Sequence, residues 1–165
     1  MKQYGYTLIE LLLYVAIMGI LLGALTSFFS VSLSSRIKNE SIIEVDRQGE
    51  FMIDTIARTT RAADLITAPA VGVSGDTLIL AMATAGVNPT IFDISGTTLQ
   101  IKEGTGATIP LNSNRVAVTG FTVKNLSRVS TPGAIQISFT VSTVNTTGRN
   151  EYDYQKTFTT SASLR

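Results

Sequence analysis

Residues 5–29 read GYTLIELLLYVAIMGILLGALTSFF, an apolar run with a single charged side chain, Glu10. At about 1.5 Å per residue, a helix over residues 8–29 covers roughly 30 Å, which matches the core of a bilayer. A secretory signal has a shorter apolar region, of about 7 to 15 residues, followed by a small-residue cleavage site. We therefore predict a transmembrane helix rather than an ordinary cleaved signal.

Glu10 is the residue of this run that most needs a physical explanation. An acidic side chain at the centre of a membrane helix is unfavourable by roughly 2.5 to 3.5 kcal/mol, so a carboxylate there is a candidate functional group that needs a partner. The nearest basic residues are Lys2 before the run and Arg36 and Lys38 after it. These charges are nearly balanced, so they do not decide the orientation of the helix.

Composition removes most enzyme classes. The 165-residue chain has no cysteine and no histidine, which eliminates disulfides, Cys/His zinc sites and every catalytic arrangement that needs a thiol or an imidazole. Its 13 Lys+Arg and 12 Asp+Glu give a formal charge of +1, which attracts nucleic acid only weakly. We predict no enzymatic activity, no catalytic residue, no cofactor, no metal and no small-molecule substrate.

The residues at the start of the apolar run carry a family resemblance. A short basic leader ends in Gly5, and Tyr6 precedes the sequence Thr-Leu-Ile-Glu-Leu at residues 7–11. This pattern resembles the leader-cleavage site of type IV pilins and pseudopilins, with Tyr6 in place of the commoner Phe. The resemblance implies that a prepilin peptidase in the membrane cuts between Gly5 and Tyr6 and methylates the new terminus to N-methyl-Tyr6.

The same resemblance implies a partner for Glu10. Cleavage creates an α-amine, whose reference pKa of about 7.7 to 8 leaves it largely cationic at neutral pH. Tyr6 and Glu10 are four residues apart, so a pair within one helix is open. The family implies a second solution, in which Glu10 neutralises the amino terminus of a neighbouring subunit in a filament. Glu10 is therefore the candidate assembly residue.

Two further features of the terminal segment bear on assembly. Gly19 and Gly23 form a GxxxG pair, which permits close approach of membrane helices, and they are candidate helix-packing residues. Residues 24–32 contain no proline, whereas many major pilins carry one there. The absence of cysteine also removes the disulfide-bounded terminal loop common in major pilins. Both departures favour a minor pilin or a pseudopilin.

The helical pattern continues beyond the membrane through residues 34–66. This segment has no proline, and its apolar residues form a stripe at helical spacing that also includes Gly49 and Thr59: Ile42, Val45, Met52, Ile56, Ala63 and Ile66. We predict an amphipathic rod whose apolar face is covered by a sheet, with a short coiled coil as the alternative. One helix from Tyr6 to about Ala63 would be roughly 85 Å long.

After Pro69 the composition shifts to Thr, Ser, Gly and Val, and alternation replaces the helical period. Ser95-Gly96 and residues 103–106 favour tight turns, and residues 134–144 alternate as a strand with one buried face does. Strands are predicted at residues 77–82, 90–94, 97–102, 108–111, 115–124, 134–144 and 154–164.

These elements predict an α+β pilin fold, in which a long N-terminal helix packs on an antiparallel β-sheet. The first half of the helix is transmembrane and the second half is amphipathic. The predicted organisation is a prepilin leader at residues 1–5, the transmembrane half at 6–33, the amphipathic soluble half at 34–66 and the β domain at 67–165.

The β domain offers little candidate chemistry. Glu151 and Asp153 have the spacing of paired calcium ligands, but no acidic loop of recognised spacing surrounds them, so solvated turn carboxylates are the simpler interpretation. The candidates for a DNA-binding patch are dispersed along the sequence, which favours scattered solvated charges: Arg115, Lys124, Arg128, Arg149 and Lys156, with Tyr152 and Tyr154.

The leading hypothesis is a structural subunit of a type IV pilus-like filament, most simply a minor pilin. It would be processed by prepilin peptidase and assembled with other pilin or pseudopilin subunits from the inner or cytoplasmic membrane. Before assembly it would be a single-pass membrane protein with its soluble domain outside the cytoplasm, and afterwards part of an extracellular or periplasmic filament. The alternatives are a type II secretion pseudopilin, a subunit of a DNA-uptake filament, or a filament-tip adhesin or DNA-binding module that contacts a surface, glycan or DNA.

Overall fold

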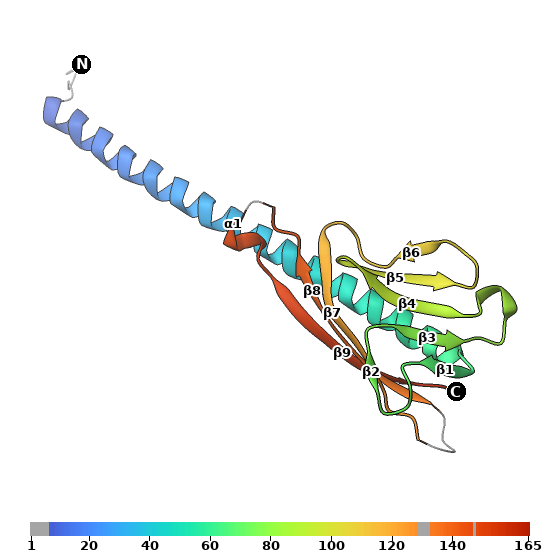
Figure 1. The fold of residues 1–165 in the computed structure, drawn as a ribbon. Helices are drawn as coiled ribbons and strands as arrows, with labels where there is room; N and C mark the ends of the chain where they lie inside the picture. Colours follow the sequence, from blue (N-terminus) through green and yellow to red (C-terminus); the bar gives the residue numbers. More distant parts are fainter. Residues whose placement is uncertain (1–6, 129–132, 147) are drawn as a thin grey trace.

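The computed structural model describes residues 7–128, 133–146 and 148–165. One helix, α1 (Leu8–Ala62), is followed by nine strands and two short 3-10 turns, and every pairing between strands is antiparallel. The first half of α1 projects from the domain, and its second half runs along the sheets (Figure 1). The elements after α1 are β1 (Leu65–Ala68), β2 (Ser74–Gly75), β3 (Leu78–Ala81), η1 (Ala85–Val87), β4 (Thr90–Ser95), β5 (Thr98–Glu103), β6 (Thr108–Pro110), β7 (Val116–Asn125), β8 (Ala134–Thr143), η2 (Asn150–Tyr152) and β9 (Gln155–Ser163).

The strands form two sheets, whereas the sequence analysis expected one. One sheet has the order β1-β3-β4-β5-β6 and the other the order β2-β7-β8-β9. Alternation identifies strands and their buried faces but does not fix which strands pair, and this explains why the division was missed. The α+β class and the packing of a long helix on antiparallel strands are confirmed, because the buried faces of both sheets and of α1 form one core.

The second half of α1 enters that core through a narrow stripe. Its buried residues follow steps of three and four, as the sequence predicted, but the stripe begins with Ser41 and ends with Thr60 where Ile42 and Thr59 had been expected. The Thr60 hydroxyl donates to the Ile56 carbonyl at 2.8 Å, so its burial leaves no polar group unsatisfied. The stripe packs on sheet strands, which excludes the coiled-coil alternative for the described helix. The buried helix residues are Ser41, Val45, Gly49, Met52, Ile56, Ala57 and Thr60.

The helix ends at Ala62, one residue before the predicted end at about Ala63, so the amphipathic half predicted at residues 34–66 is four residues too long. Ala63 has extended backbone, and β1 begins at Leu65. Ile66 is buried as expected but on a strand, where it pairs with Leu80 of β3. Its distance of three residues from Ala63 matches helical spacing, and periodicity alone does not separate a last helical turn from a short buried strand.

The predicted strands from β3 to β9 are present with ends that differ by one residue, and β1 and β2 were missed. In β8, Ile135, Ile137, Phe139 and Val141 are all buried and alternate with more exposed polar residues. The β4–β5 hairpin pairs Ser95 with Thr98, so its two-residue loop lies one position later than the Ser95-Gly96 turn that was predicted.

One asparagine connects the two sheets. The Asn112 side chain accepts a hydrogen bond from the Leu99 amide of β5 at 2.8 Å and donates to the Val116 carbonyl of β7 at 2.9 Å. The Val118 amide also donates to the Thr97 carbonyl at 2.9 Å. These bonds fix the start of the second sheet against the first.

At Gly49, α1 lies very close to β9. A Cβ atom built on Gly49 would lie 2.2 Å from the Cζ atom of Phe158, which is buried and stacks on Phe139 with a centroid separation of 5.9 Å. A packed aromatic ring moves less easily than the end of a flexible side chain. Glycine at this position therefore allows the helix to lie directly against β9.

We expect Gly49→Ala to destabilise the domain. Alanine favours a helix interior by about 1 kcal/mol relative to glycine, but overpacking a fitted core costs roughly 1 to 3 kcal/mol. Because the overlap with Phe158 is severe, the free-energy cost of overpacking should exceed the gain in helix propensity. Thermal unfolding of the full chain in detergent micelles measures the effect. Phe158→Leu removes the overlapping ring atoms, so Gly49→Ala should cost less in that background; an equal cost in both backgrounds would show that the close approach is not the cause.

A second prediction concerns the ion pair between α1 and β9. Lys156 Nζ lies 2.9 Å from Asp46 Oδ1, and this hydrogen bond raises the pKa of Lys156 above the ordinary lysine value of 10.5. A raised lysine pKa contributes stability below the unfolded-state value, and the contribution is lost as the pH rises through the folded-state value. Lys156→Met should therefore lower Tm slightly at pH 8, and the difference from wild type should vanish once the pH exceeds the folded-state pKa. Lys102→Met is the control, and its difference should not show this pH dependence.

Candidate functional site

The projecting half of α1 is uncovered along its whole length. Residues 8–33 are all exposed, including Leu8 at 79% and Phe28 at 69%, and this part of the helix is long and apolar enough to cross a membrane. An apolar surface of this extent is not stable in water and indicates contact with lipid or with other proteins. The helix therefore fits a single-pass membrane anchor.

Three hydroxyl side chains in or just after this anchor are satisfied by their own helix. Thr26 donates to the Leu22 carbonyl at 2.8 Å, and Ser34 and Ser35 each donate to the carbonyl four residues earlier. Hydrogen bonding to the preceding turn satisfies a hydroxyl group inside an apolar medium without a partner helix.

The first turn of α1 contains Glu10. Thr7 has extended backbone and makes no side-chain cap, but its carbonyl accepts from the Glu10 and Leu11 amides at 3.1 and 3.2 Å. A carboxylate in the first helical turn is favoured by the positive end of the helix dipole. Gly5 and Tyr6, the predicted cleavage and methylation positions, lie outside the described residues, so the geometry of the predicted Tyr6–Glu10 pair stays untested.

The Glu10 carboxylate is solvent-exposed and has no cationic partner within residues 7–128, 133–146 and 148–165. Its contact is with Tyr14, whose hydroxyl lies 3.5 Å from Oε1, the upper limit of a hydrogen bond. Sequence reasoning did not single out Tyr14, although its position four residues after Glu10 places the two side chains on one helix face. This long contact satisfies the carboxylate only weakly and leaves it open to a positive charge.

Gly19 and Gly23 lie on one face of the exposed helix. A Cβ atom added at either glycine would meet no atom of this chain within 4 Å. Neither residue is therefore needed to pack this subunit against itself, in contrast to Gly49. Small residues at this spacing allow a second helix to approach closely.

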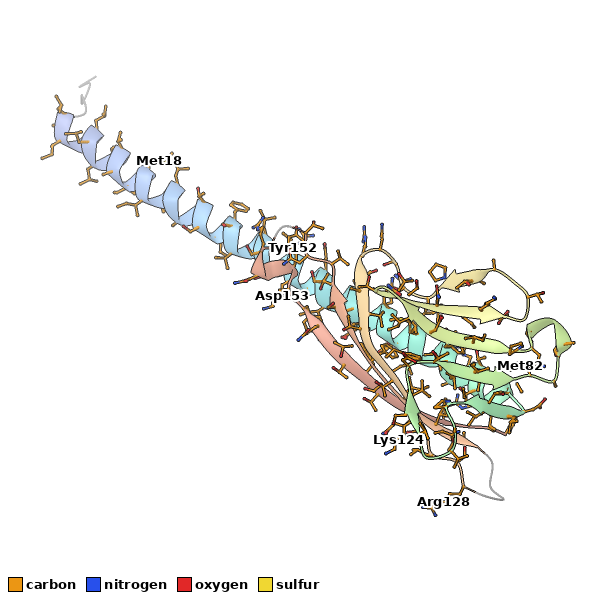
Figure 2. All side chains as sticks on the ribbon, in the orientation of Figure 1. Met18, Met82, Lys124, Arg128, Tyr152 and Asp153 are labelled. Carbon is orange, nitrogen blue, oxygen red and sulfur yellow. The ribbon has the colours of Figure 1, made fainter. Side chains whose placement is uncertain are left out.

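The DNA-patch candidates are divided between two regions. Arg115 and Tyr152 line one pocket together with the acidic residues Glu40 and Glu44, and the Tyr152 amide donates to the Arg149 carbonyl at 3.1 Å. Lys124 and Arg128 lie at the end of the second sheet that is far from Tyr152 and Asp153, which lie close to the middle of α1 (Figure 2). Lys156 is paired with Asp46. Electrostatic attraction to DNA needs basic residues gathered along one surface, and this set is divided.

The calcium candidates are also weak in the structure. Asp153 is exposed, and the side chain of Glu151 lies outside the described residues. Within the described part of the chain, no three Asp, Glu, His or Cys residues are grouped closely enough to hold a metal ion.

Comparison with known proteins identifies the terminal segment. Residues 1–26 match the family model described as the prokaryotic N-terminal methylation motif. No curated protein and no solved structure gives a significant match to the chain. The match covers the candidate residues Gly5, Tyr6, Glu10, Gly19 and Gly23 but none of the β domain.

We expect large residues at the glycine pair to disturb helix association without disturbing the domain. Gly19→Ile and Gly23→Ile should leave the Tm of the domain unchanged, because both glycines are exposed on the projecting half of α1 and a Cβ atom there meets nothing within 4 Å. They should reduce cross-linking between neighbouring subunits in the membrane, because a bulky side chain prevents close approach. Ala24→Ile is the matched control, since Ala24 lies about 100° around the helix from Gly23. Unchanged cross-linking in both glycine variants would remove the packing role.

Proposed function

The chain is type IV pilin-like at its amino terminus, where it carries the methylation motif typical of pilins and pseudopilins, and we propose from this that it is a structural subunit of a type IV pilus-like filament. The motif marks the chain as a substrate of prepilin peptidase. We place the cut between Gly5 and Tyr6, with methylation of Tyr6. The soluble domain would lie outside the cytoplasm before assembly, and the filament would be extracellular or periplasmic.

The observation that carries this proposal is the exposed, continuous helix whose first turn holds a carboxylate with no cationic partner among the described residues. Residues 8–33 have no protein cover in the isolated chain, and the membrane provides that cover only until the subunit leaves it. Packing against the same segment of other subunits would keep this surface out of water during and after assembly. A filament with a core of such helices accounts for the exposed apolar surface both before assembly, when lipid covers it, and after assembly, when other subunits cover it.

Glu10 would direct this packing. Removal of the leader creates an α-amine that is largely cationic at neutral pH. In the apolar interior of a helix bundle, an unpaired carboxylate and an unpaired ammonium are each strongly unfavourable. The axial position of a subunit that brings the two groups together is therefore favoured over other axial positions along its neighbour. We assign the Glu10 partner to the amino terminus of a neighbouring subunit.

Within the pilin-like class, we propose a minor pilin. The absence of a proline in residues 24–32 and of cysteine supports this choice over a major pilin, and the same features also fit a type II secretion pseudopilin. We further propose that the chain is not an enzyme, because it has no thiol or imidazole for nucleophilic or acid–base chemistry. Adhesion to a surface or glycan, or DNA binding, remains the second candidate and would be an additional activity of the β domain.

We expect Glu10→Ala to be processed but not assembled. The substitution removes the charge that would pair with the new amino terminus, while Gly5 and the apolar segment remain. In a host with an active prepilin peptidase, mass spectrometry should find N-methyl-Tyr6 in both wild type and variant. Sheared filament fractions should contain the wild type and lack Glu10→Ala.

Two controls make the assay decisive. Tyr14→Phe removes the hydroxyl near Glu10 and should assemble, because the carboxylate remains. If the chain were only a membrane tether, its Glu10→Ala variant would still bind the ligand normally. If the chain is a filament subunit, the Glu10→Ala variant should not reach the filament. Wild-type levels of Glu10→Ala in filaments would refute charge neutralisation, and an intact Met1 in the mature wild type would refute processing.

A further inference from the structure

The strand β9 forms an open edge of the second sheet. It pairs with β8 over nine consecutive residues without a register shift, and no strand lies on its other side in the described chain. Figure 1 shows β9 as the outer strand, running in the same direction as the second half of α1. A long regular edge presents a row of backbone groups to any other chain in extended conformation.

The direction of those backbone groups follows from the bonds at each end of β9. The Thr143 amide donates to the Tyr154 carbonyl at 3.0 Å, and the Leu164 amide donates to the Gly133 carbonyl at 2.7 Å. Because hydrogen bonding alternates along an antiparallel strand, the even-numbered residues of β9 face β8 and the odd-numbered ones face away. The amides and carbonyls of residues 157, 159 and 161 have no hydrogen-bond partner among the described residues.

The other sheet edges in the chain are blunted, and β9 is not. The edge strand β6 is short and ends in Pro110, β2 has only two residues, and β1 has a register shift between Ile66 and Ala68. Short strands, proline and bulges are the features that prevent edge pairing. β9 contains no proline and no bulge, and its single charge, Lys156, is paired with Asp46 of the helix.

The helix provides a platform beside this edge. Asp46 contacts β9, whereas Gln48 on the other flank bonds Ser113 at 3.1 Å, so the Asp46 flank faces the open side. Ile43 and Glu50 lie three and four residues from Asp46 on that flank, and both are exposed, Ile43 at 64%. An added strand would therefore meet apolar and acidic helix side chains on one face.

The solvent-facing side of the second sheet determines which side chains an added strand should carry on its own solvent-facing side. Thr140 and Thr157 are joined by a hydroxyl hydrogen bond of 2.8 Å, and Ser138 and Thr159 by one of 3.2 Å. These short, uncharged side chains present no charge that would repel an adjacent strand. A strand with apolar residues toward the helix and hydroxyl residues outward would continue both layers.

We propose that β9 is a docking edge for an extended segment of a different protein chain, which adds to the second sheet as a further strand. A second copy of this chain does not fit through its own β9. Such a pair would be two-fold symmetric and antiparallel, so the two α1 helices would point in opposite directions. Copies anchored in one membrane have their helices parallel. This exclusion rests on the membrane anchor of the proposed function, but the test does not require filament assembly.

The test uses the full chain in detergent micelles and a synthetic probe with the required alternation, the acetylated and amidated peptide AIQISFTVST of residues 134–143. The free chain should show fast amide exchange at Thr157, Thr159 and Ser161 and slow exchange at Phe158 and Thr160. Saturating peptide should slow the three edge amides by at least about tenfold. Equal protection of odd and even residues in the free chain, or no saturable binding at 1 mM peptide, would overturn the proposal.

Backbone methylation distinguishes strand addition from displacement of β8. When it adds antiparallel to β9 with its apolar side chains toward the helix, the peptide directs the amides of its hydroxyl-face residues at β9. N-methylation at Gln136, Ser138 and Thr140 should abolish binding, and N-methylation at Ile135, Ile137 and Phe139 should preserve it. A peptide that replaced β8 would pair with β9 through the amides of Ile135, Ile137 and Phe139 and with β7 through those of Gln136, Ser138 and Thr140, so either methylation would weaken it. Loss of binding with both methylated peptides, or equal binding of both, would refute an open edge.

A matched pair of chain variants completes the experiment. Thr159→Pro removes an outward amide that is not used by β8, and it should weaken peptide binding about tenfold, the equivalent of one or two backbone hydrogen bonds. Thr159→Val keeps the amide and should bind as wild type does. Thr157→Lys adds a charge on the outward face; it removes the hydroxyl bond to Thr140 but keeps the backbone pairing with β8, and it should also weaken binding. Equal affinity in all variants would refute the proposal; Glu10→Ala should not alter affinity, which separates this result from the filament test.

Discussion

The close approach of α1 to β9 at Gly49 determines how the rest of the molecule is arranged. The Phe158 ring occupies the space where any other residue would place a Cβ atom, so the helix lies directly against the strand. This contact sets the rotation of the helix. Val45, Met52 and Ile56 then point into the core, and Asp46 comes within 2.9 Å of Lys156. A helix held at a larger distance would leave the stripe partly hydrated.

The same helix serves two environments, and this links the domain to the anchor. α1 is continuous from Leu8 to Ala62, about 80 Å at 1.5 Å per residue, without a described break between its exposed apolar half and its packed half. A shift or rotation of α1 that is set by the pairing of Glu10 is therefore passed on to the β domain, because backbone hydrogen bonds hold the helix together as one unit. The glycines differ between the two halves: the space beside Gly49 is filled by Phe158 of the same subunit, whereas a Cβ atom at Gly19 or Gly23 would meet open space.

The β9 strand has two roles that follow from its position at the end of the sheet. One face of it supports the helix through Phe158 and Ala162, and its free edge remains open. A central strand would have no edge, and a strand away from the helix would offer an added chain no second surface. The combination of an unblunted edge with an adjoining helix flank distinguishes β9 from β1, β2 and β6.

The sequence by itself determined the elements whose signals are local. The apolar run, Glu10 and the residues before it predict the anchor and the processing motif, and the helical and alternating periods locate α1 and the strands from β3 to β9. Local pattern located the end of α1 to within one residue but could not decide the short strands β1 and β2 or the division into two sheets, because these depend on pairing between distant segments. The tertiary structure alone assigned Gly49 to a contact with Phe158, Asn112 to the junction of the sheets, and β9 to an open edge. Each depends on which atoms meet across the fold, and a residue's neighbours in the sequence do not specify that.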